Sequence, residues 1–258
     1  MFIDTHAHLY LDQFSDDIDM VVELCKEEGV EHIYLPNVDA ATVDSLHELV
    51  ESYPSMMHPM MGVHPCSINE NYRKELELAL RLLEQREYAG IGEIGIDLYW
   101  DKTFHKEQQE AFRIQIEWAR DMNKPFVIHS RDSLDETIDI VSHLQDGTLT
   151  GIFHCFNGNE EQARKIIDIG FLLGIGGVIT FKNAGVREEL VNISINHMVL
   201  ETDAPYLSPT PFRGKRNQSN YIPIIAEQLA ETLEIEVEQV EKITTQNAIN
   251  LFNTPIQL

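Results

Sequence analysis

The chain has 258 residues, of which 43% are hydrophobic, so it is long enough to bury a sizeable core. Its formal net charge is -24, from 19 basic and 43 acidic residues. This charge argues against broad, non-specific binding to nucleic acid, because such affinity comes from Lys and Arg side chains on phosphates. A nucleic-acid site must therefore depend on local positive charge, to which bound metal ions contribute.

Three features favour a cytoplasmic protein that is not inserted in a membrane. No run of 18 apolar residues is present, and the amino-terminal segment does not have the pattern of a signal peptide. Cys25, Cys66 and Cys155 form no C-x-x-C pair, which is typical of a reducing compartment, and we expect all three to be small buried hydrophobes. Nothing in the sequence indicates an obligate protein partner.

Short apolar, β-rich runs recur along the chain, and each run ends in polar residues. Their starts are 22 to 37 residues apart, which is the spacing of βαβ units. We predict strands at residues 2–8, 32–38, 57–64, 88–97, 125–130, 149–156, 171–177 and 197–203.

Amphipathic stretches with helix signals separate these runs. Ser15, Asp16 and Asp17 can cap a helix whose apolar stripe ends before Gly29, and the helix predicted at residues 159–169 ends at Gly170. Pro223 fits an early helical turn. Further helices are predicted at residues 104–122, 224–233 and 236–252.

Eight strands that alternate with helices in about 250 residues predict a single (β/α)8 TIM barrel spanning residues 1–258. A doubly wound open sheet is the alternative. That fold predicts a glycine-rich phosphate turn after the first strand, and the sequence has none there.

Histidines and carboxylates gather at the carboxyl ends of the predicted strands. In a barrel these ends converge on the catalytic face. His6 and His8 are two residues apart, so in a strand both side chains point to the same face. The other polar residues at strand ends are His64, Glu93, Asp97, His129, His154, Glu201 and Asp203.

This set exceeds the needs of one catalytic metal, which typically takes three protein ligands and a water. It fits two divalent ions about 3.5–4 Å apart that share a carboxylate. We predict that Glu93 bridges the ions, that His6, His8 and Asp203 complete one, and that His129 and His154 complete the other.

Two cations and few thiolates indicate hydrolysis rather than redox chemistry. Asp203 is the candidate acceptor of the proton of the attacking water. Glu201 is expected either to orient a metal ligand or to be a buried structural carboxylate. His64 is expected to contact a phosphate or donate a proton to the leaving oxygen.

A basic loop follows the last predicted strand. In barrels the loops after strands seven and eight often bind phosphate. Residues 209–217 contain three of the 19 basic residues, and Arg131 adds a cation just past His129. The candidate substrate-binding residues are Arg131, Arg213, Lys215, Arg216 and Asn217.

With these residues in view, the chain resembles the TatD family of metal-dependent hydrolases, often described as TatD-type deoxyribonucleases. The resemblance implies a TIM barrel, two divalent ions and phosphodiester hydrolysis, often of DNA from an end. It places metal ligands at the six positions that the spacing selects, and Cys66 stands where relatives often have histidine. The motifs that carry it lie at residues 4–9, 62–65, 92–97, 129–131, 154–156, 201–206, 213–217 and 247–252.

Other hydrolases remain open as alternatives. One is amide, lactone or ester hydrolysis of a small metabolite, although barrels of that group often bridge their metals with a carbamylated lysine where this chain has Glu93. Another is ester hydrolysis on D-aminoacyl-tRNA. The imidazole and carboxylate donors suit zinc, manganese, magnesium or nickel.

Overall fold

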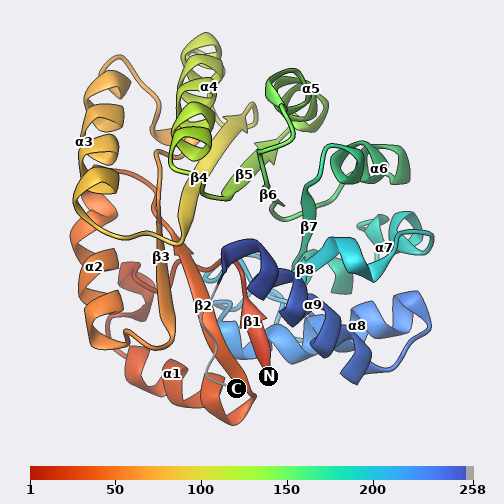
Figure 1. The fold of residues 1–258 in the computed structure, drawn as a ribbon. Helices are drawn as coiled ribbons and strands as arrows, with labels where there is room; N and C mark the ends of the chain where they lie inside the picture. Colours follow the sequence, from red (N-terminus) through yellow and green to blue (C-terminus); the bar gives the residue numbers. More distant parts are fainter. Residues whose placement is uncertain (254–258) are drawn as a thin grey trace.

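A computed structural model describes residues 1–253 and shows parallel strands surrounded by helices (Figure 1). The strands pair in sequence order as one eight-stranded sheet, β1-β2-β3-β4-β5-β6-β7-β8. Because the order follows the chain, the predicted (β/α)8 barrel is confirmed. The strands are β1 (Phe2–Asp4), β2 (Val30–Pro36), β3 (Met57–Met61), β4 (Gly90–Asp97), β5 (Phe126–Arg131), β6 (Gly151–Phe153), β7 (Leu172–Ile175) and β8 (Met198–Leu200).

The segment after β1 closes the barrel against the segment after β8. The amide of Thr5 donates to the Leu200 carbonyl at 3.0 Å, and the amide of Asp203 donates to the His6 carbonyl at 2.8 Å. Asp4, which is fully buried, accepts from the Thr202 hydroxyl at 2.6 Å. The last residue of β1 is therefore used to join the barrel's two ends.

The five helices that the sequence patterns place correspond to α1, α4, α6, α8 and α9. Asn159 and Gln162 form a capping box at the start of α6, and Gly170, at φ 85°, follows its end. The helices are α1 (Ile18–Glu27), α2 (Val43–Ser52), α3 (Tyr72–Gln85), α4 (His105–Asp121), α5 (Leu134–Leu144), α6 (Glu160–Asp168), α7 (Val186–Leu190), α8 (Ile222–Leu233) and α9 (Val237–Phe252). None of these described helices has the length and apolar character needed to span a membrane.

Helix α9 packs next to β1 and β8 (Figure 1), where it contributes to the apolar packing of the barrel interior. Phe252 stacks on Tyr34 of β2, with ring centroids 3.8 Å apart, and Ala248 lies in the same cluster. This cluster also contains Ile3, Met60, Val127, Ile152 and Val199 from five of the strands. This cluster is apolar, and the histidines and carboxylates lie instead at the carboxyl ends of the strands.

The pair of His32 and His58, on β2 and β3, predicts a pH-dependent stability. His32 Nδ1 is 2.8 Å from His58 Nε2. Burial, and then the charge of His32, lower the pKa of His58 from its usual 6.5 to about 4. The folded state therefore favours the neutral ring, so stability is lost as pH falls from 6.5 toward 4, by up to about 3 kcal/mol at 1.36 kcal/mol per pKa unit.

The His58→Gln variant is expected to lose less stability than the parent over this pH range. Urea unfolding at pH 7 and pH 4.5 measures the difference in the free energy of unfolding. An equal loss in both proteins would show that the pair does not contribute.

Candidate metal centre at the carboxyl end of the barrel

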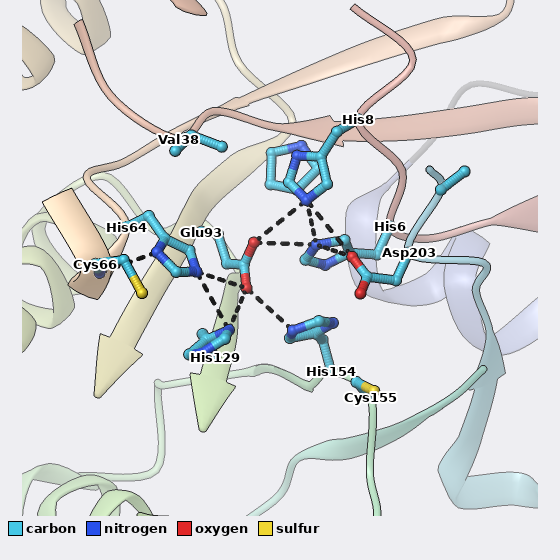
Figure 2. Close-up of polar contacts among 12 residues, drawn as sticks. His6, His8, Val38, His64, Cys66, Glu93, His129, His154, Cys155 and Asp203 are labelled. Atoms are coloured by element: carbon cyan, nitrogen blue, oxygen red, sulfur yellow. Dashed lines mark hydrogen bonds and ion pairs between the residues drawn. The ribbon is translucent and has the colours of Figure 1, made fainter. Parts of the chain in front are cut away.

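Glu93 occupies the centre of the polar cluster, and its two carboxylate oxygens face different histidines (Figure 2). Oε2 lies 3.1 Å from His6 Nε2 and 3.5 Å from His8 Nε2. Oε1 lies 2.8 Å from His129 Nδ1 and 3.0 Å from His154 Nε2. One carboxylate thus lies between two groups of imidazole nitrogens.

Asp203 joins the first of these groups. Its Oδ1 lies 3.7 Å from His6 Nε2 and 3.6 Å from His8 Nε2. The donor atoms of these three residues lie within 4.8 Å of one another, as do those of His6, Glu93 and His154. His6 therefore belongs to two candidate metal-binding groups.

The charges of this cluster suit a cation. Burial raises the pKa of Glu93, but the surrounding His154, His6 and His64 outweigh it and hold that pKa well below the usual range. Burial likewise raises the pKa of Asp203, and the contact with His8 helps to lower it on balance. Both carboxylates are therefore ionised at neutral pH, as metal ligands must be.

The contact between His6 and His8 is the observation that tests the fit of a metal. Their Nε2 atoms lie only 3.2 Å apart, both rings are buried, and both atoms also face Glu93. Neutral imidazole nitrogen is a common ligand of divalent ions, and these two Nε2 atoms converge on the same carboxylate oxygen of Glu93. The donor set of imidazole and carboxylate thus fits a divalent ion.

Three of the histidines direct their second ring nitrogen toward an oxygen acceptor. His8 Nδ1 is 2.9 Å from the Tyr10 hydroxyl, which itself donates to the Pro36 carbonyl at 2.5 Å. His129 Nε2 is 2.9 Å from Asp97. His154 Nδ1 is 3.3 Å from Glu201. A proton on these nitrogens leaves the other nitrogen of each ring free as a ligand.

Glu201 is held in a space that a neighbouring glycine leaves open. Its Oε1 accepts from the amide of Cys155 at 2.5 Å, and its side chain is fully buried. A Cβ at Gly174, on β7, would stand 2.2 Å from Glu201 Oε2. Glu201 is thus placed beside His154, where a residue that orients this ligand must lie.

Asp97 and Tyr10 are the functional contacts that the sequence analysis did not assign. Asp97 comes four residues after Glu93 in β4, so both side chains fall on the same strand face. Tyr10 stands two residues after His8, as His8 does after His6. These spacings were a usable signal, although neither indicates which ring nitrogen the residue contacts.

The Asp97→Asn variant is expected to bind metal about 10- to 100-fold more weakly, because the amide no longer fixes the orientation of His129 as a carboxylate does. A chelator competition titration measures this affinity. Asp121→Asn, an exposed change on α4, is the matched control. Equal affinity in both variants would contradict the role.

His64 differs from the other histidines of the cluster. Its Nδ1 accepts from the amide of Cys66 at 3.0 Å, so the neutral ring carries its proton on Nε2. That Nε2 lies 3.6 Å from Glu93 Oε1 and 3.3 Å from His129 Nδ1. His64 therefore presents an N–H donor to the cluster rather than a lone pair.

The predicted substrate-binding residues separate into two kinds of surroundings. Arg131, Arg213 and Lys215 are exposed, and the Arg213 guanidinium lies 3.5 Å from the Phe181 ring centroid. Arg216 instead forms two 2.7 Å contacts with Asp17. Asn217 is buried and donates to the carbonyls of Thr202 and Tyr206 at 2.7 and 2.6 Å. The last two residues hold the loop in place.

The expectation for the cysteines needs correction. All three are free thiols, but Cys25 alone among them is buried, whereas Cys66 is exposed and Cys155 is partly exposed. Cys66 lies in the short turn Pro65–Ser67 after β3, and Cys155 directly follows His154. Both stand in loops beside the polar cluster rather than on a packed helix or strand.

Comparisons with known proteins identify the family. A family model described as TatD related DNase matches residues 3–253. The chain belongs to the TatD family. This confirms the resemblance, and the family's relatives make it a metal-dependent hydrolase. A TatD relative in Bacillus subtilis (strain 168), named uncharacterized metal-dependent hydrolase YabD, is 38% identical over 98% of this chain and 99% of its own length.

Other TatD relatives agree. The Escherichia coli (strain K12) protein named uncharacterized metal-dependent hydrolase YcfH is 30% identical over 97% of this chain and 95% of its own. The crystal structure of YjjV, a TatD homologue from E. coli, superposes with a TM-score of 0.92 at 27% identity and covers 98% of both chains. The fold and family are therefore consistent over nearly the whole chain.

Proposed function

We propose that this TatD-family hydrolase cleaves phosphodiester bonds of nucleic acid, with DNA as substrate and attack from a strand end. The observation that carries the proposal is the Glu93 carboxylate, whose two oxygens each face separate imidazole nitrogens at 2.8 to 3.5 Å. Two cations about 3.5–4 Å apart with a shared carboxylate suit in-line displacement at phosphorus.

Under this proposal six residues hold two divalent ions. His6, His8 and Asp203 serve one ion, His129 and His154 the other, and Glu93 both. When bound, divalent ions act as Lewis acids and lower the pKa of water from 15.7 to about 7. The imidazoles of the donor set favour zinc or nickel, and its carboxylates suit manganese or magnesium.

The chain's own residues accept a proton, donate a proton and neutralise the charge of the phosphate. The Asp203 side chain is 14% exposed, against 3% for Glu93, so an attacking water reaches it and gives up its proton there. His64 donates its Nε2–H to the phosphate or the leaving oxygen. Arg131, Arg213 and Lys215 neutralise the negative charge that grows on the phosphate.

The acidic surface predicts a weak dependence of DNA binding on salt. A net charge of -24 repels long duplex DNA and leaves local cations to contact the strand end. Each phosphate contact with a single strand lowers the slope of log binding constant against log salt concentration by about 0.7, so three contacts give a slope of about -2. Fluorescence anisotropy of a labelled oligonucleotide at several salt concentrations measures it. A slope steeper than about -5 would contradict a site with few phosphate contacts.

A substrate panel tests the proposal. Metal-stripped protein is reconstituted with zinc, manganese, nickel or magnesium and given single-stranded DNA, duplex DNA, D-aminoacyl-tRNA and a simple ester. Hydrolysis of DNA that Asp203→Asn abolishes is the expected result. If only D-aminoacyl-tRNA or the simple ester were hydrolysed, the protein would be an esterase and the proposed nuclease activity would be wrong. DNA cleavage retained in the variant would indicate a contaminant.

A further inference from the structure

Exposed apolar side chains gather around the mouth of the barrel. Among residues 1–253, six large hydrophobic side chains are exposed, and four of them follow β4 or β8. These four are Tyr99, Trp100, Tyr206 and Leu207, and Trp100 is the most exposed at 71%. A solvated apolar group beside a catalytic site indicates contact with a ligand.

Tyr99, Trp100 and Arg131 form one group. The rings of Tyr99 and Trp100 meet edge to face, with centroids 4.9 Å apart and planes at 88°. The Arg131 guanidinium lies 3.7 Å from the Tyr99 centroid and 5.4 Å from that of Trp100. We call these three side chains the aromatic platform.

The aromatic platform is tied to the metal centre through one carboxylate. Asp97 Oδ1 accepts from the amides of Tyr99 and Trp100 at 2.9 and 3.3 Å, while its Oδ2 contacts His129 at 2.9 Å. Arg131 comes two residues after His129 on β5. The position of the platform is therefore fixed relative to the residues that face Glu93.

A cavity of about 660 Å³ adjoins the platform and is lined by Tyr99 and Arg131. A volume of 300–1,000 Å³ is typical of small-molecule sites. Ser130, Asp132 and Asn157 also line it, and in the described part of the chain their side chains form no hydrogen bond with another residue. The cavity thus has hydroxyl, carboxylate and amide groups available to a ligand.

The charges of the cavity decide which part of a nucleotide enters it. Asp132, Asp135 and Glu136 line it and repel phosphate, whereas Arg131 alone among its lining residues is basic. A planar, uncharged base stacks on aromatic rings and guanidinium planes, and its N–H and carbonyl edges match carboxylate and amide groups. The surroundings therefore suit a base and its sugar.

We propose that the aromatic platform and its cavity bind the nucleobase next to the phosphodiester bond that is cleaved. The inference rests on the proposed nuclease function and narrows its substrate to unpaired strand ends. A base stacked and paired in a duplex cannot reach the platform without being unpaired. The plane of the Arg131 guanidinium stacks on the base from the side of Tyr99, while its N–H edge contacts the neighbouring phosphate, and Trp100 covers the exposed face of the base.

The kinetic test compares two single-stranded oligonucleotides that differ at one nucleotide. One has a normal terminal nucleotide, and the other has an abasic one. Trp100→Leu is expected to raise KM about 5- to 100-fold on the first and to leave the second within about twofold. Met20→Ala removes another exposed apolar side chain, on α1, and is the control. Equal effects of Trp100→Leu on both substrates, or none, would overturn the inference.

A binding test works without turnover. The chain has two tryptophans, and Trp118→Phe leaves Trp100 as the sole indole. Thymidine 5′-monophosphate is expected to quench its fluorescence, whereas 2-deoxyribose 5-phosphate is not. If thymidine 5′-monophosphate quenched the fluorescence but the protein hydrolysed no oligonucleotide, the nuclease function would be refuted and the base site would stand. Hydrolysis with no quenching and no preference for the base would refute the base site alone.

Discussion

The Glu93→Gln variant is expected to lose hydrolytic activity by on the order of 1000-fold or more and to lose both of the proposed metal ions. Glu93 is the only residue whose side chain faces His6 and His8 with one oxygen and His129 and His154 with the other, within residues 1–253. Stabilisation of transition-state charge by metals contributes several kcal/mol, which corresponds to this factor. Glutamine keeps the size of the side chain and removes its charge.

Activity and metal content must be measured together in this variant. Metal per chain is determined by mass spectrometry after dialysis against zinc or manganese, and circular dichroism confirms the fold. Glu48→Gln, an exposed change on α2, is the matched control with the same chemistry. If Glu93→Gln kept two ions and was still inactive, the carboxylate would act on the reaction itself and not as the shared ligand.

The strand pattern predicted the architecture because a buried parallel strand needs a continuous apolar run. The runs at residues 88–97 and 125–130 correspond closely to β4 and β5. The prediction was less accurate where ligands were assigned to strand ends. β1 ends at Asp4 and β8 at Leu200, so His6, His8 and Asp203 lie in the segments that follow. Those segments lie side by side because they pair with each other across the barrel's closure, through the Ala7 and Ala204 bridge and the bond from the Asp203 amide to the His6 carbonyl.

Contacts between distant parts of the chain could not be predicted from spacing. Asp17, which the pattern placed in a helix cap, makes no cap hydrogen bond and pairs with Arg216, 199 residues away. The run of basic residues at 213–216 therefore does not consist of equivalent phosphate contacts. Spacing also does not show the tautomer of His64, because it is set by a local hydrogen bond from the amide of Cys66 in the turn that follows. A motif shows which residues converge, but not which atom each presents.

Substitution of single histidines is expected to separate the two ions. Besides the two groups that contain His6, the described chain has a third candidate metal-binding group, formed by His64, Glu93 and His129. His8 belongs only to the group with His6 and Asp203, and His129 belongs only to the third group. His8→Gln should therefore lose the ion near Asp203, and His129→Gln the other. Each variant is expected to retain about one ion per chain by mass spectrometry, against two in the parent.

His6 is unsuitable for this experiment, because its Nε2 approaches both Glu93 and Asp203 and its ring stacks on His154 at 3.9 Å. Loss of His6 would disturb both groups at once. His143→Gln, an exposed change on α5, controls for the loss of an imidazole. If His8→Gln lost both ions, Glu93 and its histidines would act as one cooperative site. Hydrolysis would then depend on a single assembly around that carboxylate, and the division of ligands proposed here would be wrong.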